Sequence, residues 1–193
     1  MVDPAGDPGD DVPSVGTTNW QGGLAATRHL TALGHRRIGV ISGPSRMMCS
    51  RARVDGYRAA LETAGLPIDP ALVREGEFQH EAGYTAGLEL LRQADRPTAI
   101  FAGDDLQALG VYEAARELGL RIPEDLSVVG FDDLPLTRWI GPPLTTVRQP
   151  LTEMAETAAR LVLDLGRGRR PATTRVDLAT NLVVRSSTAA PRR

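Results

Sequence analysis

The stretch that decides the fold is Thr98–Asp133, TAIFAGDDLQALGVYEAARELGLRIPEDLSVVGFDD. TAIFA and SVVGF are continuous apolar runs, and the segment from about Leu106 to Leu118 between them predicts a helix that ends at Gly119. Continuous apolar runs are typical of strands covered by helices on both faces. The stretch therefore predicts one strand–helix–strand unit of a parallel sheet.

The same alternation continues toward the N-terminus. It predicts, in order, a helix from Thr18 to about Leu33 with Gly34 after it, a strand at 38–41, a helix from Ser50 to about 64, a strand at 72–75 and a helix at 80–93. Repeated units of this kind predict an α/β fold with a parallel, doubly wound sheet.

The two ends of the chain differ from this pattern. Residues 1–16, MVDPAGDPGDDVPSVG, are acidic and rich in proline and glycine, which predicts a leader or loop. After Gly141 we expect an extended segment at 142–147, an amphipathic helix at 151–165, short strands near Val176 and at 182–184, and a polar tail. This half is not another simple strand–helix step.

Composition limits the classes of function. The 193 residues fit one domain, or one domain with part of a second. A net charge of −2 gives no electrostatic case for nucleic-acid binding by this chain alone. The single cysteine, Cys49, excludes an internal disulfide, and neither a secretory signal nor a membrane-spanning run is present. We therefore expect a soluble, cytoplasmic protein with no membrane partner.

A ligand site is expected where the strands end, because open parallel sheets bind ligands beyond the carboxyl ends of their strands. The segments leaving those ends carry Phe78, the pair Gly103-Asp104, and the pair Asp132-Asp133. Arg53 lies in the first turn of the helix that follows the first strand. Its planar set of donors and the acceptor oxygens of Asp132 suit vicinal hydroxyls, and Phe78 offers a flat apolar face.

Each of these residues also has a purely structural interpretation, and the sequence leaves both open. Asp104 and Asp132 each precede a helix or loop that they could cap, and Asp133 is suited to a loop or capping role. Arg53 is suited to an exposed helix face, and Phe78 to core packing. Met47, Met48 and Cys49 suit either loop packing or an adaptable pocket wall.

Signatures of catalysis are missing from the sequence. His29, His35 and His80 do not have metal-ligand spacing, and Cys49 has no evident histidine partner. Neither a phosphate-binding G-x-x-x-x-G-K-[ST] loop nor a dinucleotide-binding G-x-G-x-x-G follows the first strand. A magnesium site at Asp132-Asp133 lacks the accompanying lysine and second acid. We therefore expect no enzyme activity, no metal and no cofactor.

Five segments together carry a family resemblance: GHRRIGVISGP, SRARVDGYRAALETAG, VREGEF, RPTAIFAGDDLQALGVYEAARELGLRIPEDLSVVGFDD and PPLTTVRQP. In their order and spacing they resemble the LacI/GalR family of transcription repressors, from about Val12 to Ala189. The resemblance implies a periplasmic-binding-protein-like domain of two α/β lobes joined by three crossovers, with the effector between them.

The resemblance also assigns residues to the effector site. Arg53 and Asp132 match the family's effector-binding arginine and aspartate, and Phe78 its aromatic. Gly103 falls where a polar residue often contacts sugar hydroxyls. Met47 and Cys49 fall at variable positions that tune the effector, and their apolar character argues against a purine.

By the same resemblance the chain divides into a leader or loop (1–16), part of the N-terminal lobe (17–35), the complete C-terminal effector-binding lobe (36–144), a crossover with an N-terminal-lobe helix (145–170), and C-terminal strands and tail (171–193). The helix-turn-helix headpiece that would contact operator DNA is expected to be missing from it.

The function expected is effector sensing and dimerisation in a bacterial repressor, with a sugar-like small molecule as the effector. We expect a homodimer whose surface includes Leu134, Leu136, Trp139 and Ile140. The alternative is a solute-binding protein of a sugar uptake system, and a non-functional remnant is a third possibility.

Overall fold

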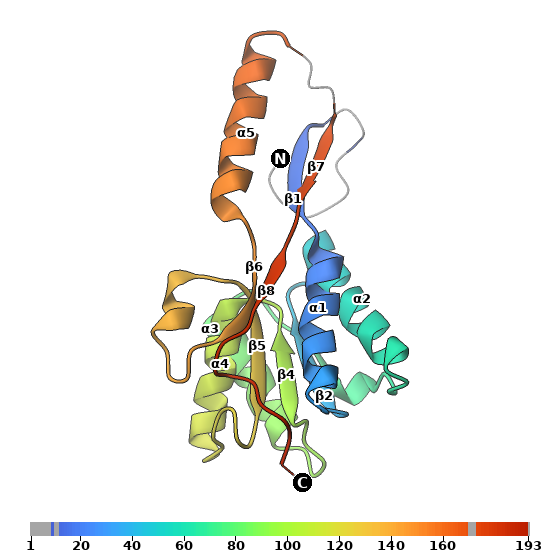
Figure 1. Cartoon of the computed structure of the whole chain (residues 1–193), viewed down its shortest axis with the longest axis vertical. Helices are drawn as coiled ribbons and strands as arrows, with labels where there is room; N and C mark the ends of the chain where they lie inside the picture. The colour runs from blue at the N-terminus through green and yellow to red at the C-terminus, as the bar shows by residue number, and fades with distance from the viewer. Residues whose placement is uncertain (1–8, 10–11, 170–172, 193) are drawn as a thin grey trace.

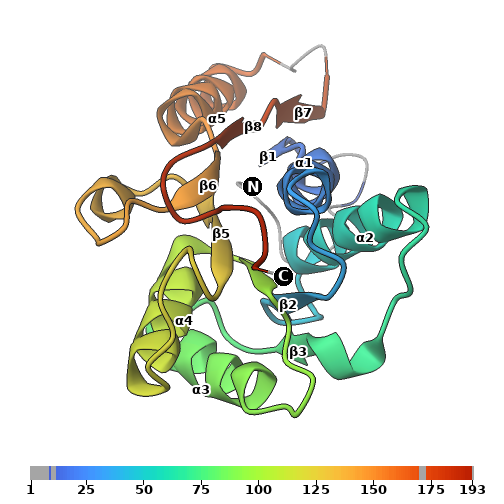
Figure 2. The same cartoon turned by 60° about the horizontal axis from the view of Figure 1, so that its bottom comes forward.

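The computed structural model describes residue 9, residues 12–169 and residues 173–192. Its main body is a six-stranded sheet covered by helices on both faces (Figures 1 and 2). The strands of this sheet are β2 (Ile38–Ser42), β3 (Val73–Glu75), β4 (Ala99–Ala102), β5 (Ser127–Asp132), β6 (Thr145–Arg148) and β8 (Asn181–Val183). The covering helices are α1 (Asn19–Ala32), α2 (Met48–Thr63), α3 (His80–Leu91) and α4 (Asp105–Glu117).

The strands run in the order β3-β2-β4-β5-β6-β8, and all neighbours are parallel except β6 and β8. The chain moves outward from β2 to β3 and then crosses back to β4 on the other side of β2. The predicted α/β fold with a parallel, doubly wound sheet is therefore confirmed. Short 3-10 helices, η1 (Pro70–Leu72) and η2 (Pro135–Arg138), precede β3 and follow β5.

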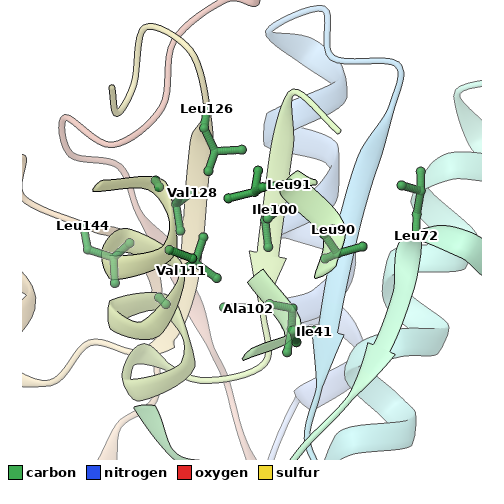
Figure 3. Packing of buried hydrophobic residues seen from close by; sticks show 14 residues of the cluster. Ile41, Leu72, Leu90, Leu91, Ile100, Ala102, Val111, Leu126, Val128 and Leu144 are labelled. Carbon is green, nitrogen blue, oxygen red and sulfur yellow. The ribbon is translucent and has the colours of Figure 1, made fainter. Parts of the chain in front are cut away.

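The core has two halves because successive strand residues point to opposite faces of the sheet. Ile100 of β4 packs in the cluster that includes Leu90 of α3 and Val111 of α4, shown in Figure 3. The next residue, Phe101, packs in the second cluster with Leu30 of α1 and Tyr57 of α2. The apolar strands are thus buried from both sides, as their sequence predicts.

Each helix pair crosses at glycines that bring the two backbones together. A Cβ atom on Gly56 of α2 would lie 2.2 Å from the carbonyl oxygen of Trp20 in α1. A Cβ atom on Gly110 of α4 would lie 2.1 Å from the carbonyl oxygen of His80 in α3. Gly23 and Gly83 make the reciprocal approaches. No side chain fits at these crossings.

A smaller part of the chain projects away from the body (Figure 1). It contains a two-stranded parallel sheet of β1 (Ser14–Thr17) and β7 (Arg175–Leu178), together with α5 (Leu151–Gly166). Only Met154 of α5 is buried, and its exposed apolar residues are Leu151, Val162, Leu163 and Leu165.

Strand β1 corrects the prediction that residues 1–16 form a leader or loop, because Ser14 to Gly16 are part of it. Its partner among the described residues, β7, comes from the far end of the chain, so no local pattern indicates it. Residues 1–8 and 10–11 of the predicted leader lie outside the described residues.

Three chain segments join the projecting part to the body, and their side chains bind one another. Thr17 Oγ1 donates to Gln149 Oε1 at 2.8 Å, which links the β1–α1 crossover to the β6–α5 crossover. Thr180, between β7 and β8, donates its backbone N–H to Thr18 Oγ1 at 2.9 Å. The crossovers therefore form one connected bundle.

The predicted polar tail packs against the body. Ser187 is fully buried, and its hydroxyl donates to the carbonyl of Val128 at 2.6 Å. The Nε2 atom of His35 lies 2.9 Å from the carbonyl oxygen of Ala189.

Within the described part of the chain, no helix is both long enough and apolar enough to cross a membrane.

Candidate functional site

Arg53 lies in α2 and is buried, with 4% of its surface exposed, so the interpretation as an exposed helix residue is wrong. Its Nε donates to Asn19 Oδ1 at 2.8 Å and its Nη1 to the carbonyl oxygen of Gly103 at 2.6 Å. The guanidinium also lies 3.7 Å from the ring centroid of Phe131, a cation–π distance. These contacts fix the guanidinium at the carboxyl ends of β4 and β5.

Phe78, between β3 and α3, lies beside this guanidinium. Its ring centroid is 5.5 Å from Arg53 Cζ, and the ring packs on Gly43, where a Cβ atom would come within 2.1 Å of it. The side chain remains half-buried. The ring therefore lies next to the arginine and packs on the first residue after β2.

Asp132 is the last residue of β5 and is half-buried. Its Oδ1 accepts a hydrogen bond from Gln149 Nε2 at 2.5 Å. Because Gln149 also binds Thr17, one side chain joins Asp132 to the crossovers. Sequence reasoning missed Gln149, although a polar residue directly after β6 occupies the same kind of strand end as the other candidates.

Asp104 precedes α4 and caps it, accepting the backbone N–H of Gln107 at 2.7 Å. Burial raises the pKa of Asp104 to about 6, the negative charge of Asp132 also raises it, and Arg53 lowers it. The capping interpretation is confirmed. Asp104 also contributes to the electrostatics of the same strand-end region as Asp132 and Arg53.

Asp105, the first residue of α4, is fully buried. Its two oxygens accept from Thr146 Oγ1 at 2.5 Å and from the backbone N–H of Leu134 at 2.8 Å. Burial raises the pKa of Asp105 to about 7, and the charges of Asp132 and Asp104 add to this rise.

A testable pH dependence follows from Asp105. In the unfolded chain its carboxyl titrates near 4, whereas in the folded chain it keeps its proton up to about pH 7. Folding therefore takes up a proton between these values, and this contribution to stability is present at low pH and lost as the pH rises through 7. Between pH 5 and pH 8, wild type should lose on the order of 2–3 kcal/mol relative to Asp105→Asn.

Urea unfolding of both proteins at the two pH values measures this difference. The comparison with the variant cancels the opposite contribution of His29 and His35, whose pKa values are lowered by burial. Equal pH dependence in the two proteins would contradict the prediction.

Asp133 has a structural role. Its carboxylate forms ion pairs with Arg148, at 2.6 Å, and with Arg185, and it accepts from Thr137 Oγ1. Although burial raises its pKa, hydrogen bonds from the two arginines lower it on balance. This confirms the loop interpretation of Asp133 and excludes it as a freely available ligand group.

The remaining predicted site residues are Cys49, Met47 and Gly103. Cys49 is buried and lines a cavity of about 200 Å³ where β1, α1 and α2 meet. Met48 lines this cavity as well, whereas Met47 is the half-buried residue that precedes α2. Gly103 contributes its carbonyl to Arg53, and the polar side chain at this strand end belongs to Asp104.

No group of three or more His, Cys, Asp or Glu residues could hold a metal ion within the described part of the chain. His35 lies in a hydrogen-bond network with Thr98 and Ser127, and His80 pairs with Glu113.

The apolar segment after β5 is only partly exposed. Trp139, directly after η2, is 79% exposed. Leu134 and Leu136 are half-buried, and Ile140 packs against the α3–α4 core cluster. Trp139 is therefore the one large apolar surface residue of the predicted set.

Residues 27–188 match the periplasmic binding protein-like domain family. Among curated proteins, the HTH-type transcriptional repressor CytR of Escherichia coli K12 is 38% identical over 180 residues, which cover 93% of this chain and 53% of CytR. The chain thus spans about half the length of the curated relatives it matches.

Solved structures give the same result. The transcriptional regulator CelR in complex with cellobiose superposes with a TM-score of 0.91 at 40% identity, covering 96% of this chain and 58% of CelR. A LacI family transcriptional regulator from Enterococcus faecium with bound ribose superposes with a TM-score of 0.90 at 30% identity, covering 99% of this chain and 70% of that one. These proteins are regulators, not enzymes.

Proposed function

Since the chain belongs to the LacI family and carries its periplasmic-binding-protein-like domain, we propose that it is the effector-sensing part of a transcription repressor and that its effector is a sugar or a related metabolite. The observation that carries the proposal is the arrangement at the carboxyl ends of the strands: Phe78 lies beside the Arg53 guanidinium, which binds the Gly103 carbonyl directly after β4, and Asp132 ends the neighbouring strand β5. Two of the similar structures hold cellobiose and ribose.

The chemistry of the three side chains suits a sugar. The Asp132 carboxylate accepts hydrogen bonds from hydroxyls, and Arg53 donates them from a guanidinium held by Asn19 and Gly103. The half-buried ring of Phe78 offers an apolar face to the C–H side of a sugar ring. A fixed donor, a fixed acceptor and a flat wall define the orientation of a small polyol.

The division of the chain follows from the same proposal. Residues 36–144 form the effector-binding lobe, with β6 and β8 completing its sheet and α1 covering one face of it. Helix α1 therefore belongs to this lobe and not, as the sequence suggests for residues 17–35, to the N-terminal lobe, because Ala26 and Leu30 are buried against β4 and β5. The projecting β1, β7 and α5 belong to the second lobe, and the bundled crossovers form the joint between the two. Effector binding at this joint would favour one orientation of the lobes over another. No operator contact is assigned to the residues of this chain.

A solute-binding protein of a sugar uptake system shares this fold and is the alternative. The similar proteins are transcriptional regulators, which favours the repressor domain.

Titration calorimetry of the purified chain against pentoses, hexoses and disaccharides, including ribose and cellobiose, tests the proposal. We expect at least one sugar to bind with a micromolar to millimolar Kd, with an affinity that falls when Asp132 is replaced. If no sugar binds at millimolar concentration, the sugar-sensing function is wrong.

We further propose that the segment around Trp139 is part of a homodimer surface. A 79% exposed tryptophan is suited to such a contact, because large aromatic side chains dominate interface energies. Trp139→Arg should leave a folded chain with half the wild-type mass by light scattering.

Val162→Arg is the matched control, since it places the same charge on another exposed apolar residue, in α5. It should keep the dimer mass. A dimer that persists unchanged in Trp139→Arg would remove this segment from the interface.

A further inference from the structure

The turn that follows β5 has an unusual backbone. Asp132 has a φ of 116° and Asp133 a φ of 59°, and both are non-glycine residues. A positive φ is unfavourable for a residue with a side chain, so the conformation persists only where the surroundings hold it. The position of the Asp132 side chain therefore depends on what fixes this turn.

The ion pairs of Asp133 with Arg148 and Arg185 fix one side of the turn. The other side is fixed by Asp105, whose Oδ2 accepts the backbone N–H of Leu134 at 2.8 Å. Asp105 Oδ1 accepts from Thr146 Oγ1 on β6 at 2.5 Å. One carboxyl thus connects α4, β6 and the turn.

Gly130 leaves the space for this carboxyl. A Cβ atom on Gly130 would lie 2.4 Å from Asp105 Oδ1, so a larger residue in this position of β5 would displace it. The Asp105 carboxyl therefore packs directly on β5 at Gly130, two residues before Asp132.

Leu134 carries the connection further. Its N–H is bound by Asp105, and its carbonyl accepts from both the backbone N–H of Thr137, at 3.0 Å, and Thr137 Oγ1, at 2.6 Å. The two bonds from Thr137 lie in the first turn of η2, and η2 leads to Trp139. Asp105 therefore holds the N–H of Leu134, and η2 holds its carbonyl.

The residues that bind the Asp105 carboxyl, Thr146 and Leu134, carry no positive charge, and the nearby acids Asp104 and Asp132 raise its pKa further. A buried carboxyl without a cation is unfavourable for stability alone. An asparagine would satisfy the same two partners, accepting from Leu134 and donating to Thr146. Asp105 is better explained by what it holds than by the stability it contributes.

We propose that Asp105 is a positioning residue for the effector site: its side chain holds the turn 132–134, so that Asp132 and η2 move as one unit. The role of Asp132 as an effector ligand rests on the proposed function, whereas the positioning of the turn does not.

The test uses amide hydrogen exchange of the whole chain, measured by NMR without any sugar. In Asp105→Ala, the Leu134 amide should exchange at least 10-fold faster than in wild type, and the change should extend to Thr137. In Asp105→Asn, exchange at Leu134 should stay within about 3-fold of wild type, because the amide oxygen still accepts this N–H. Unchanged exchange in Asp105→Ala would overturn the proposal, and so would equal acceleration in both variants.

Thr146→Val keeps the test decisive if Asp105→Ala does not fold. It removes the second anchor of the carboxyl and preserves the shape of the side chain. We expect faster exchange at Leu134 in Thr146→Val, with the Gly39 amide of the sheet interior unchanged. If the Leu134 amide exchanged at the wild-type rate in Thr146→Val, the Asp105 carboxyl would hold the turn without its hydrogen bond to β6, contrary to the proposal.

A second measurement separates this inference from the proposed function. For a sugar identified by calorimetry, affinity should fall at least 10-fold in Asp105→Ala and recover in Asp105→Asn. If exchange responds as expected and no sugar binds, the positioning role stands and the sugar-sensing function fails. If a sugar binds equally to all three proteins, Asp105 does not position Asp132.

Discussion

Replacing Asp132 with asparagine should reduce sugar affinity by about 10- to 100-fold and leave the folded state intact. The loss corresponds to charge-assisted hydrogen bonds of about 1.5–3 kcal/mol from ligand hydroxyls to the carboxylate. Asparagine tolerates the positive φ of 116° at this position better than alanine does. Its side-chain oxygen also still accepts from Gln149, so the link to the crossovers is kept.

The matched control is Asp125→Asn. Asp125 lies just before the opposite end of β5, where it binds Arg121 and Arg192 near the surface. The same change of charge there should leave sugar affinity within about 2-fold. Calorimetry and thermal unfolding of both variants provide the measurement, and undiminished affinity in Asp132→Asn would disprove the site.

Arg53 is a less useful residue for this test. Arg53 is buried and donates to Asn19 and to the carbonyl of Gly103, so Arg53→Ala removes a buried hydrogen bond from each of these groups. Each such group costs about 1–3 kcal/mol, so the variant should lose stability together with affinity.

Replacing Gly110 with alanine should destabilise the fold by roughly 3 kcal/mol or more. The new Cβ atom would lie 2.1 Å from the carbonyl oxygen of His80 and 2.3 Å from the backbone nitrogen of Tyr84. Both are backbone atoms of α3, so no side-chain rotation relieves the overlap and the two helices must separate. Overpacking of this kind costs about 1–3 kcal/mol even where side chains can adjust.

Gly166→Ala is the control, because a Cβ atom at the end of α5 meets nothing within 4 Å. Its unfolding midpoint in urea should equal that of wild type or exceed it slightly, since alanine favours a helix by up to about 1 kcal/mol. A Gly110→Ala midpoint equal to that of Gly166→Ala would contradict the close helix crossing.

The sequence predicts the parts of the molecule that depend on local patterns. Apolar strand runs and glycines after helices give the parallel sheet, and the rule that ligands bind at strand ends selects Arg53, Phe78 and Asp132 as candidates for one site. Side-chain burial is harder to predict. Asp104 and Asp105 are adjacent acids, and only the packing against Gly130 distinguishes the capping residue from the fully buried one.

Contacts between distant segments account for most of what the sequence does not predict. Strand β1 depends on β7, and Gln149 gains its role only when β6 places it beside Asp132 and Thr17. The close helix crossings at glycine also depend on contacts between distant segments. In the sequence, Gly56 and Gly110 only interrupt a helix pattern, and the need for glycine follows from the backbone of the facing helix.

The bundled crossovers have a mechanical consequence. A joint of one chain segment can swivel freely, whereas three segments side by side resist torsion and still allow bending. The bonds Thr17–Gln149 and Thr18–Thr180 tie the segments together, which adds to that resistance. The projecting part should therefore tilt relative to the body about an axis through the crossovers, without twisting. Gln149 binds both Thr17 in one crossover and Asp132 at the end of β5, so a displacement of Asp132 would act directly on the crossovers.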